Sequence, residues 1–426
     1  MAKRPIVIRY LDYTRIAVLI LAVLGITSAQ ARTITVSPTG EIRSVKEAVR
    51  RAQPHDTILV NPGLYRENDI TINKPLAIIG QQQPILDAGF QKGVFSVMAQ
   101  NVLIAGLTIR NVEESFVKNY AAVRVRGGGH VTVRDNNILN TYYGVYLEQT
   151  DSCAVLNNTI RGQAKQETTS GNAIHVWRAR AISIKNNNVA GHRDGIYLES
   201  AGNSIVIGNT SNNNLRYGLH FMFSDNNRYE RNRFSQNGAG IAVMYSRNIH
   251  MSDNLFEQNW GAAAYGILLK DIVDSRIERN IFRQNTTGIH AEGSTRMVIK
   301  NNEFRNNGWA VRLLGSSEDV SFEQNNFIGN TFEISTSTNY SSYNTFTGNY
   351  WSSYTGYDLD HDGIGDVPHK PVKLFTYLVE DVPAAVVLLR SMFMDLLELI
   401  EKVAPVLTPE NIIDTAPSTR LNHWKS

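Results

Sequence analysis

The feature that most constrains the fold of this chain is a short internal repeat, in which a Gly or Ala is followed by an apolar residue. The pairs are Gly144-Val145, Ala173-Ile174, Gly195-Ile196, Gly218-Leu219, Gly240-Ile241, Gly266-Ile267, Gly288-Ile289 and Ala310-Val311. Subtracting the positions of successive pairs gives spacings of 29, 22, 23, 22, 26, 22 and 22. A nearly constant period of this length is typical of a solenoid, in which each repeat forms one coil.

The residues after each pair alternate between apolar and other types, which predicts a half-buried strand with every second side chain pointing inward. Leucine-rich repeats share this period, but residues 102–327 show no helical spacing and are rich in Asn and β-branched residues. We therefore predict an all-β fold, a right-handed parallel β-helix of about twelve coils, with successive coils ~4.8 Å apart. We expect the Asn residues at tight corners, where the backbone is left-handed.

Residues 1–31 are predicted to be a secretory signal peptide. They combine Lys3 and Arg4, an apolar run over residues 16–26, and Ala29-Gln30-Ala31 as a cleavage site. The alternative is an uncleaved anchor, but the run is shorter than the ~20 residues that span a membrane. The segment holds four of the 42 basic and one of the 39 acidic residues, so 38 of each sign remain. This balance, without a basic block, gives no support for nucleic-acid binding.

The rest of the chain divides into four expected parts: an N-terminal cap with the first strands at 32–75, the β-helix at 76–350, an Asp-rich loop at 351–371, and a C-terminal helical segment and tail at 372–426. In the cap, Ser44 and Glu47 form a capping box for a short helix that could cover the open end of the solenoid. The single cysteine, Cys153, cannot form an internal disulfide, and we expect a buried thiol.

The chain from Pro383 to about residue 406 is predicted to form an amphipathic helix that is apolar around most of its circumference. It is too charged to span a bilayer. Packing on the end of the solenoid would cover one face of this helix. The apolar residues on its other faces indicate a second partner, either a protein or a membrane surface. A simple C-terminal cap is the alternative.

Stacking of the coils brings sulfur and imidazole side chains together. His220 and Met222 point outward on one coil, Met244 lies beside Met222 on the next, and His175 lies two coils earlier with Tyr197 between. Thioether and imidazole groups are ligands that suit Cu(I). These residues are therefore our candidate copper ligands, and the alternative is that they decorate the surface without a metal.

A second candidate metal site lies in the Asp-rich loop. Asp358, Asp360, Asp362 and Asp366 occupy positions one, three, five and nine, and Gly363 occupies position six. This spacing is that of the first half of a calcium-binding loop. Position twelve is His369 instead of the usual Glu, so a structural Ca²⁺ and an Asp-rich turn without metal both remain open.

Three segments carry a resemblance to a known family: residues 194–199, Asp-Gly-Ile-Tyr-Leu-Glu; residues 216–224, Arg-Tyr-Gly-Leu-His-Phe-Met-Phe-Ser; and residues 348–351, Gly-Asn-Tyr-Trp, which lead into the Asp-rich stretch 357–368. Across essentially the whole mature chain the sequence resembles the NosD family. The resemblance implies a periplasmic, right-handed β-helix that works with an ABC transporter, its permease and its ATPase, in the maturation of nitrous oxide reductase. It further implies that copper comes from a lipoprotein chaperone and passes toward the reductase, and that the helix at 383–406 docks onto the permease.

Such a protein is an accessory factor and not an enzyme. The rival interpretation is a periplasmic polysaccharide lyase or epimerase, because β-helices often carry these activities and such enzymes need clustered carboxylates with a basic residue. The best available set is Asp194 with Arg193, His192, Glu199 and Glu148. A passive surface or scaffold protein is the third interpretation.

Overall fold

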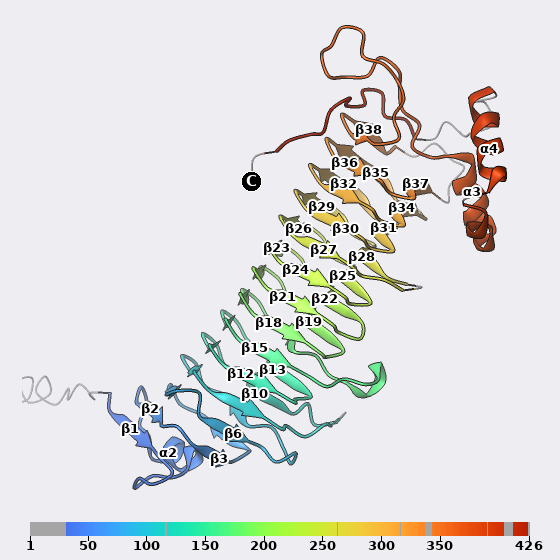
Figure 1. Cartoon of the computed structure of the whole chain (residues 1–426). Helices are drawn as coiled ribbons and strands as arrows, with labels where there is room; N and C mark the ends of the chain where they lie inside the picture. Colours follow the sequence, from blue (N-terminus) through green and yellow to red (C-terminus); the bar gives the residue numbers. More distant parts are fainter. Residues whose placement is uncertain are drawn as a thin grey trace, which may run out of the picture.

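The protein is described by a computed structural model in which the following residues are placed: 31–115, 117–261, 263–315, 317–336, 343–389, 391–403 and 412–424. The predicted signal peptide, residues 1–31, lies outside these ranges except for its last residue. The prediction of a parallel β-helix is confirmed: the strands wind into a solenoid of about 13 turns (Figure 1). Each turn contributes one strand to each of three parallel sheets, which we call sheets A, B and C.

Sheet A opens the chain and continues to the last coil. Its fourteen strands are, in spatial order, β1 (Thr33–Val36), β2 (Thr57–Val60), β5 (Ala77–Gly80), β8 (Leu103–Ala105), β11 (Thr132–Arg134), β14 (Ala154–Leu156), β17 (Ser183–Lys185), β20 (Ile205–Ile207), β23 (Arg228–Glu230), β26 (His250–Ser252), β29 (Val273–Glu278), β32 (Thr295–Lys300), β35 (Glu318–Glu323) and β38 (Thr345–Thr347).

Sheet B forms the second wall of the solenoid. Its thirteen strands are β3 (Leu64–Arg66), β6 (Ile85–Asp87), β9 (Thr108–Arg110), β12 (Asn137–Leu139), β15 (Thr159–Arg161), β18 (Asn188–Ala190), β21 (Thr210–Asn212), β24 (Arg233–Ser235), β27 (Leu255–Glu257), β30 (Ile281–Arg283), β33 (Glu303–Arg305), β36 (Asn326–Ile328) and β39 (Tyr350–Trp351).

Sheet C is the wall that carries the predicted Gly-apolar pairs. Its twelve strands are β4 (Ile70–Ile72), β7 (Phe95–Val97), β10 (Ala121–Arg126), β13 (Tyr143–Glu148), β16 (Ile174–Trp177), β19 (Asp194–Glu199), β22 (Tyr217–Met222), β25 (Ala239–Met244), β28 (Tyr265–Lys270), β31 (Thr287–Glu292), β34 (Trp309–Leu314) and β37 (Phe332–Thr336). The polar insertion predicted at 161–171 projects from the coil between β15 and β16 and contains a short 3-10 helix, η1 (Glu167–Thr169) (Figure 1).

The core is a set of apolar columns that run along the solenoid axis. In sheet B, aromatic side chains from successive coils stack at ring-centroid distances of 4.1 to 5.5 Å. The stacked residues are Phe234, Phe256, Phe282, Phe304, Phe327 and Trp351, all fully buried. Because the coils repeat in register, like side chains meet like side chains, and stacked rings pack without gaps. The inward columns are therefore apolar, as the repeat predicts.

Asparagine side chains form a second repeated feature, a buried hydrogen-bonded ladder at the corner before sheet B. The Nδ2 of each donates to the Oδ1 of the next, and the final donation goes to Asp414 Oδ2. The ladder consists of Asn136, Asn158, Asn187, Asn209, Asn232, Asn254, Asn280, Asn302, Asn325 and Asn349. The expectation that the repeated Asn residues adopt the left-handed conformation is wrong for this ladder. The left-handed residue is the preceding one, such as Asn157 or Asn186, and this turn points the ladder Asn inward.

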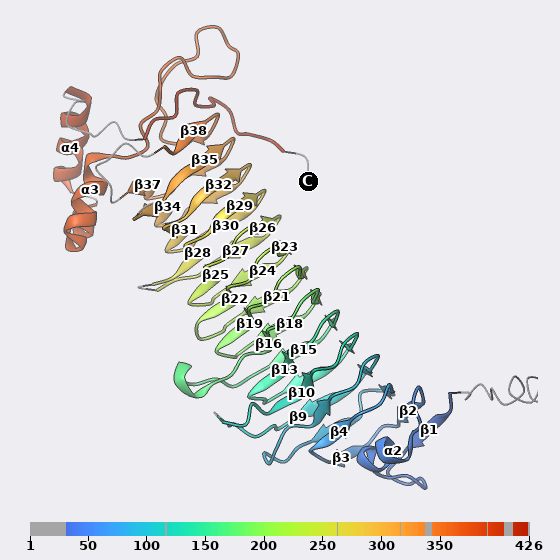
Figure 2. The same ribbon diagram turned by 180° about the vertical axis from the view of Figure 1, so that it is seen from behind.

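The N-terminal end of the solenoid is covered by α2 (Val45–Arg51) (Figures 1 and 2). Ser44 caps it, as predicted, by accepting a hydrogen bond from Glu47 N at 3.1 Å. The Glu47 carboxylate pairs with Arg51 instead of completing the capping box. Glu67 satisfies the first-turn amides by accepting from Val45 N and Lys46 N at 2.8 Å. A carboxylate at this position also interacts favourably with the helix dipole.

The C-terminal helical segment differs from the single helix expected at 383–406. It consists of α3 (Leu374–Asp381), which was not predicted, η2 (Pro383–Leu388) and α4 (Met392–Val403); residues 404–406 lie outside the described ranges. Pro383 explains the break, since proline has no amide proton to continue the hydrogen bonding of α3. Phe375 and Val379 pack against Phe332 of sheet C, so the helices lie beside the last coils (Figures 1 and 2). No helix in the described part of the chain is long and apolar enough to cross a bilayer.

The tail over residues 412–424 contains no helix or strand, but it covers the last coil through isolated β-bridges of Asp414 and Ser418. Asp414 is fully buried and accepts hydrogen bonds from Asn349 Nδ2 and Trp351 Nε1, both at 3.0 Å. Asn422 and Asn326 exchange two further hydrogen bonds. The final carboxylate of the Asn ladder thus comes from a segment 65 residues further along the chain.

Candidate functional site

The candidate copper ligands lie on the outer side of sheet C, and their register follows the repeat. Met222 pairs with Met244 across β22 and β25. His220 pairs with Tyr197, and Tyr197 pairs with His175 in β16. The neighbours of His220 within its strand, Leu219 and Phe221, are core residues with no exposed surface, so His220 points to the opposite side.

The structure separates His175 from the other three candidates. The Tyr197 ring lies between the two imidazoles, with centroid distances of 4.8 Å to each. His175 Nδ1 lies 3.0 Å from the Asn172 side-chain amide. Burial lowers the pKa of His175 to about 3, and Arg193 nearby adds to this effect, so the ring is neutral. His175 therefore belongs to an aromatic stack with Tyr143 and Tyr146 and does not join the methionine pair.

The outer side of sheet C is less open at this site than the sequence predicts. We expected the histidines on an exposed wall, yet His220 is 5% exposed and His175 is 8% exposed. The reason is that tyrosine rings from the same or neighbouring coils pack edge-on against both imidazoles, as Tyr217 does against His220. Met222 and Met244, at the ends of their strands, are half-buried. The thioethers therefore lie nearer to solvent than the imidazole.

Asp194 and Arg216 hold the imidazole of His220 in place. Arg216 donates two hydrogen bonds to the Asp194 carboxylate, at 3.1 and 2.9 Å. His220 Nδ1 lies 3.5 Å from Asp194 Oδ2 and 3.2 Å from Arg216 Nη2. Burial alone raises the pKa of Asp194, but the contacts with His220 and Arg216 outweigh it and hold the pKa below its usual value. The fully buried carboxylate is therefore charged.

The other ring nitrogen of His220, Nε2, is buried and has no hydrogen-bond partner among the described residues. Arg216 Nη2 can only donate, so its 3.2 Å contact makes Nδ1 an acceptor and leaves the proton on Nε2. When Nδ1–H instead donates to Asp194 Oδ2, 3.5 Å away, Nε2 carries the free lone pair that a metal ligand needs. A carboxylate on the far nitrogen is the arrangement that orients metal-binding histidines in proteins. The sequence placed Asp194 only in the rival carbohydrate site. Its position one coil before Arg216 is the signal that could have linked it to His220.

Two further polar groups adjoin the methionine pair. The Tyr197 hydroxyl donates to the Glu199 carboxylate at 2.9 Å and lies 3.9 Å from Met222 Sδ. Glu199 pairs in register with Met222. Burial raises the pKa of Tyr197, and the Glu199 charge raises it further, so the phenol keeps its proton. Met222 thus lies between a second thioether and a phenol–carboxylate pair, which the sequence interpretation did not assign to this site.

The Asp-rich loop brings together part of its predicted ligand set. Ligand oxygens of Asp358, Asp360 and Asp362 lie within 4.8 Å of one another. Asp366 is outside this group, and its carboxylate accepts from Leu359 N at 2.7 Å. His369, at position twelve, places Nε2 3.3 Å from Glu333. The loop therefore has the first three carboxylates of a calcium site without the usual final one.

The residues of the rival carbohydrate site do not converge on an open groove. The Asp194 carboxylate is fully buried and paired with Arg216. Glu148 is buried and accepts from Arg124 Nε at 3.0 Å. His192 is buried, and burial lowers its pKa to about 4. General acid–base catalysis needs such groups within reach of the substrate proton.

Comparison with known proteins identifies relatives along most of the chain. The model of a family described as "Periplasmic copper-binding protein (NosD)" matches residues 157–356, and a model for a protein of unknown function matches residues 72–226. A "Probable ABC transporter binding protein NosD" from Pseudomonas aeruginosa is 27% identical over 95% of this chain and 95% of its own. The protein of that name from Stutzerimonas stutzeri is 26% identical over 83% of this chain and 85% of its own.

Solved structures share the fold. The A-module of a mannuronan C-5 epimerase from Azotobacter vinelandii superposes with a TM-score of 0.58 at 14% identity, over 72% of this chain and 93% of that one. A surface adhesin of Streptococcus pneumoniae gives a TM-score of 0.55 at 10% identity, over 76% and 91%. An enzyme and an adhesin match about equally well, so these likenesses establish the architecture alone.

Proposed function

We propose that this chain, which matches the family described as "Periplasmic copper-binding protein (NosD)" over residues 157–356, is a member of that family that accepts Cu(I) and passes it to nitrous oxide reductase during maturation of the metal centre. The relatives' names link the family to ABC transporters. In this proposal the copper is cargo, received from a lipoprotein chaperone, and the protein works together with the permease and ATPase of such a transporter. The protein itself acts as an accessory factor and not as an enzyme.

The observation that carries the proposal is the in-register pair Met222 and Met244 beside His220, whose Nε2 has no partner among the described residues. Thioether and imidazole groups suit Cu(I). We assign these three residues as ligands, with Asp194 orienting the imidazole, and we no longer include His175. The half-buried thioethers offer a route by which a partner could exchange the ion from the solvent side.

The test is a titration of the signal-free protein with Cu(I) under reducing conditions, in competition with a chromophoric chelator. Replacing both methionines, Met222→Leu and Met244→Leu, should lower the affinity by at least about 100-fold, because leucine keeps the volume but has no donor atom. The matched control replaces two exposed methionines elsewhere, Met98→Leu and Met392→Leu. Equal affinity in the two double variants would remove the copper site.

For the transporter contact, we propose α4. Met392, Leu396, Leu399 and Val403 are exposed at helical spacing and form an apolar stripe on this helix. Met394 and Leu397, on the other side of α4, pack against the α3 cluster, so the helix serves both as a cap and as a docking surface. Burying the stripe against the permease would remove apolar surface from water.

The contact can be tested by replacing Leu396 and Leu399 with Glu. The solenoid should keep its circular dichroism spectrum, but the protein should no longer co-purify with membranes that contain the permease. A control with Lys at the similarly exposed Leu64, near the N-terminal end, should co-purify like the unchanged protein. Retention of the Glu variant on the membranes would leave α4 as a cap alone.

For the Asp-rich loop, we propose a structural Ca²⁺ held by Asp358, Asp360 and Asp362. Asp358 Oδ1 is buried without a hydrogen-bond partner among the described residues, which fits an oxygen that faces a cation. Calcium prefers carboxylate oxygens of this kind. Addition of Ca²⁺ should raise the thermal unfolding midpoint, and Asp360→Asn should abolish the increase. The same midpoint in Ca²⁺ and in chelator would argue for a turn without metal.

A further inference from the structure

The corner directly after sheet C carries an unusual pair of residues. In nine successive coils the residue at this corner is left-handed, with φ between 50° and 63°. The residues are Gly127, Gln149, Arg178, Ser200, Phe223, Tyr245, Asp271, Gly293 and Gly315. Most are glycine or polar residues, as this conformation favours. Phe223 and Tyr245 are the exceptions, and they directly follow Met222 and Met244.

Two features of Phe223 and Tyr245 cost folding free energy: their left-handed backbone and their exposed aromatic surface. A left-handed conformation costs roughly 1–2 kcal/mol for a residue with a side chain. Phe223 is 55% exposed and Tyr245 is 41% exposed, so much of their apolar surface is not used for core packing. The two rings stack on each other with centroids 5.2 Å apart and an interplanar angle of 12°. What distinguishes this pair from other left-handed residues is that two exposed aromatic rings from successive coils stack into one apolar patch, which is available for binding.

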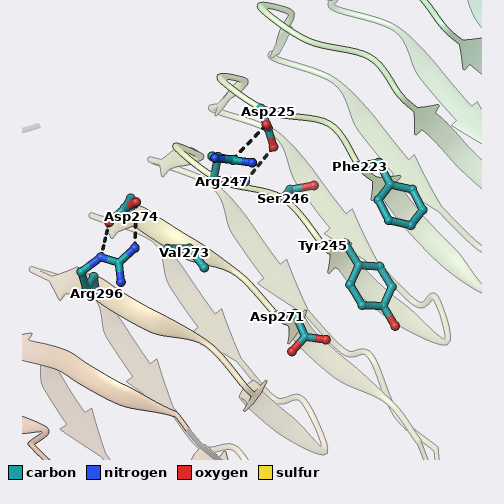
Figure 3. Close-up of a pocket in the computed structure, with 9 residues that line it drawn as sticks. All are labelled: Phe223, Asp225, Tyr245, Ser246, Arg247, Asp271, Val273, Asp274 and Arg296. Carbon is teal, nitrogen blue, oxygen red and sulfur yellow. Dashed lines mark hydrogen bonds and ion pairs between the residues drawn. The ribbon is translucent and has the colours of Figure 1, made fainter.

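The rings form one wall of a pocket of about 440 Å³ (Figure 3). Ser246 and Val273 lie between this wall and the opposite one. The opposite wall consists of two ion pairs: Arg247 with Asp225, at 3.2 Å, and Arg296 with Asp274, at 2.6 and 3.1 Å. The pocket has the size of a site for a small ligand or one large side chain.

The charge of the pocket favours a cation. Its lining contains three carboxylates and two guanidinium groups. Both guanidinium groups are paired, whereas the Asp271 carboxylate has no hydrogen-bond or ion-pair partner within the described ranges of the chain. Asp271 lies one coil beyond Tyr245, because Met244 and Lys270 pair in register. The pocket therefore combines an aromatic face with an unpaired negative charge ~4.8 Å further along the axis.

We propose that this pocket binds an arginine side chain of a partner protein, with the guanidinium stacked on the Tyr245 ring and paired with Asp271. A guanidinium is planar and cationic, so it can stack on an aromatic face and donate two hydrogen bonds to a carboxylate at once. An ammonium group can also make a cation–π contact with the ring, but it is not planar and lacks the fork of donors that pairs with both carboxylate oxygens. A partner held here lies next to Met222 and Met244, although the proposal itself does not depend on copper.

The test uses saturation-transfer NMR on the full mature protein, without metal, with the peptide acetyl-Gly-Arg-Gly-amide as the probe. Saturation should pass to the arginine methylene protons. The signal should fall at least fivefold in Tyr245→Gly, in Asp271→Asn, and when citrulline replaces arginine in the peptide. Glycine adopts the corner conformation without strain, so Tyr245→Gly should fold.

The matched controls change residues of the same kind outside the pocket. Phe90→Gly removes another exposed aromatic side chain from a left-handed position, and Asp151→Asn removes an exposed carboxylate several coils away. Both should keep the full signal. Equal transfer to the arginine and citrulline peptides, or an equal loss in the control variants, overturns the proposal. Because no copper is present, this result is separate from the titration of the methionine site.

Discussion

His220 and His290 occupy equivalent positions in sheet C, three coils apart, yet their surroundings differ. Both are nearly buried, at 5% and 9% exposure. Each packs against a tyrosine of its own or the preceding coil: Tyr217 at 4.9 Å from His220, and Tyr265 at 4.8 Å from His290. Each also has one ring nitrogen without a hydrogen-bond partner in the described part of the chain, Nε2 in His220 and Nδ1 in His290. A histidine at this strand position is therefore covered by tyrosine rings in either coil, whatever its other neighbours are.

The neighbours decide what each imidazole can do. Two residues after His220 comes Met222, with Met244 beside it, whereas Glu292 follows His290 and pairs with Lys270. Asp194 lies against Nδ1 of His220. Burial lowers the pKa of His290, and the positive charge of Arg312 in the next coil lowers it further. Both histidines have an arginine and a carboxylate nearby, but a soft cation finds two thioethers beside the first histidine, whereas Lys270 and Glu292 occupy the same strand position beside the second.

The strongest way to break this comparison is to replace each histidine in turn. His220→Gln should weaken Cu(I) binding by roughly 100-fold or more, since loss of a ligand should cost at least as much as the loss of a group that orients one. His290→Gln should leave the affinity within about twofold. Chelator competition measures both. Equal losses would mean that the strand position matters and the neighbours do not.

A smaller effect is expected from the group that orients His220. Asp194→Asn should weaken Cu(I) binding by about 10- to 100-fold, because the amide no longer fixes the imidazole with a charged acceptor. Asp253→Asn is the control: Asp253 accepts two hydrogen bonds from Arg279 of the next coil, at 2.8 and 2.9 Å, but has no histidine beside it among the described contacts. It should cost stability without changing the affinity. If Asp194 only neutralises Arg216 and does not orient His220, the two variants should bind Cu(I) with equal affinity.

The smallest expected effect is the pH dependence of stability that His175 causes. This histidine packs among tyrosines and is not one of the three assigned copper ligands. Its pKa falls from 6.5 to about 3 on folding, so its contribution to stability is complete above pH 6.5 and is lost as the pH falls toward 3. Between pH 7.5 and pH 5.5 this costs about 1.4 kcal/mol of unfolding free energy. His175→Gln should remove that part of the decline, as measured by denaturant unfolding at the two pH values. An unchanged decline would show that His175 is protonated in the folded protein.

The sequence predicted the repeat, the inward columns and the Met222–Met244 register because all three follow from a period of fixed length. It could not predict that tyrosines would cover His220 and His175, since that depends on how rings from several strands pack together. It also missed Asp194, because the register places this residue beside Tyr217 but does not show that its carboxylate turns toward Arg216 and His220. The break at Pro383 could be read from the chain, but the packing of α3 on Phe332 could not.

The sequence by itself determined the winding of this protein, because a short and nearly constant period with alternating apolar positions leaves few other ways to bury the core. It also determined which side chains become neighbours along the axis. Only the tertiary structure decided how open each neighbourhood is, which histidine nitrogen lacks a partner among the described residues, and where Asp414 closes the Asn ladder. These properties arise from contacts between coils and from the returning tail, and such long-range packing is not encoded in any single repeat.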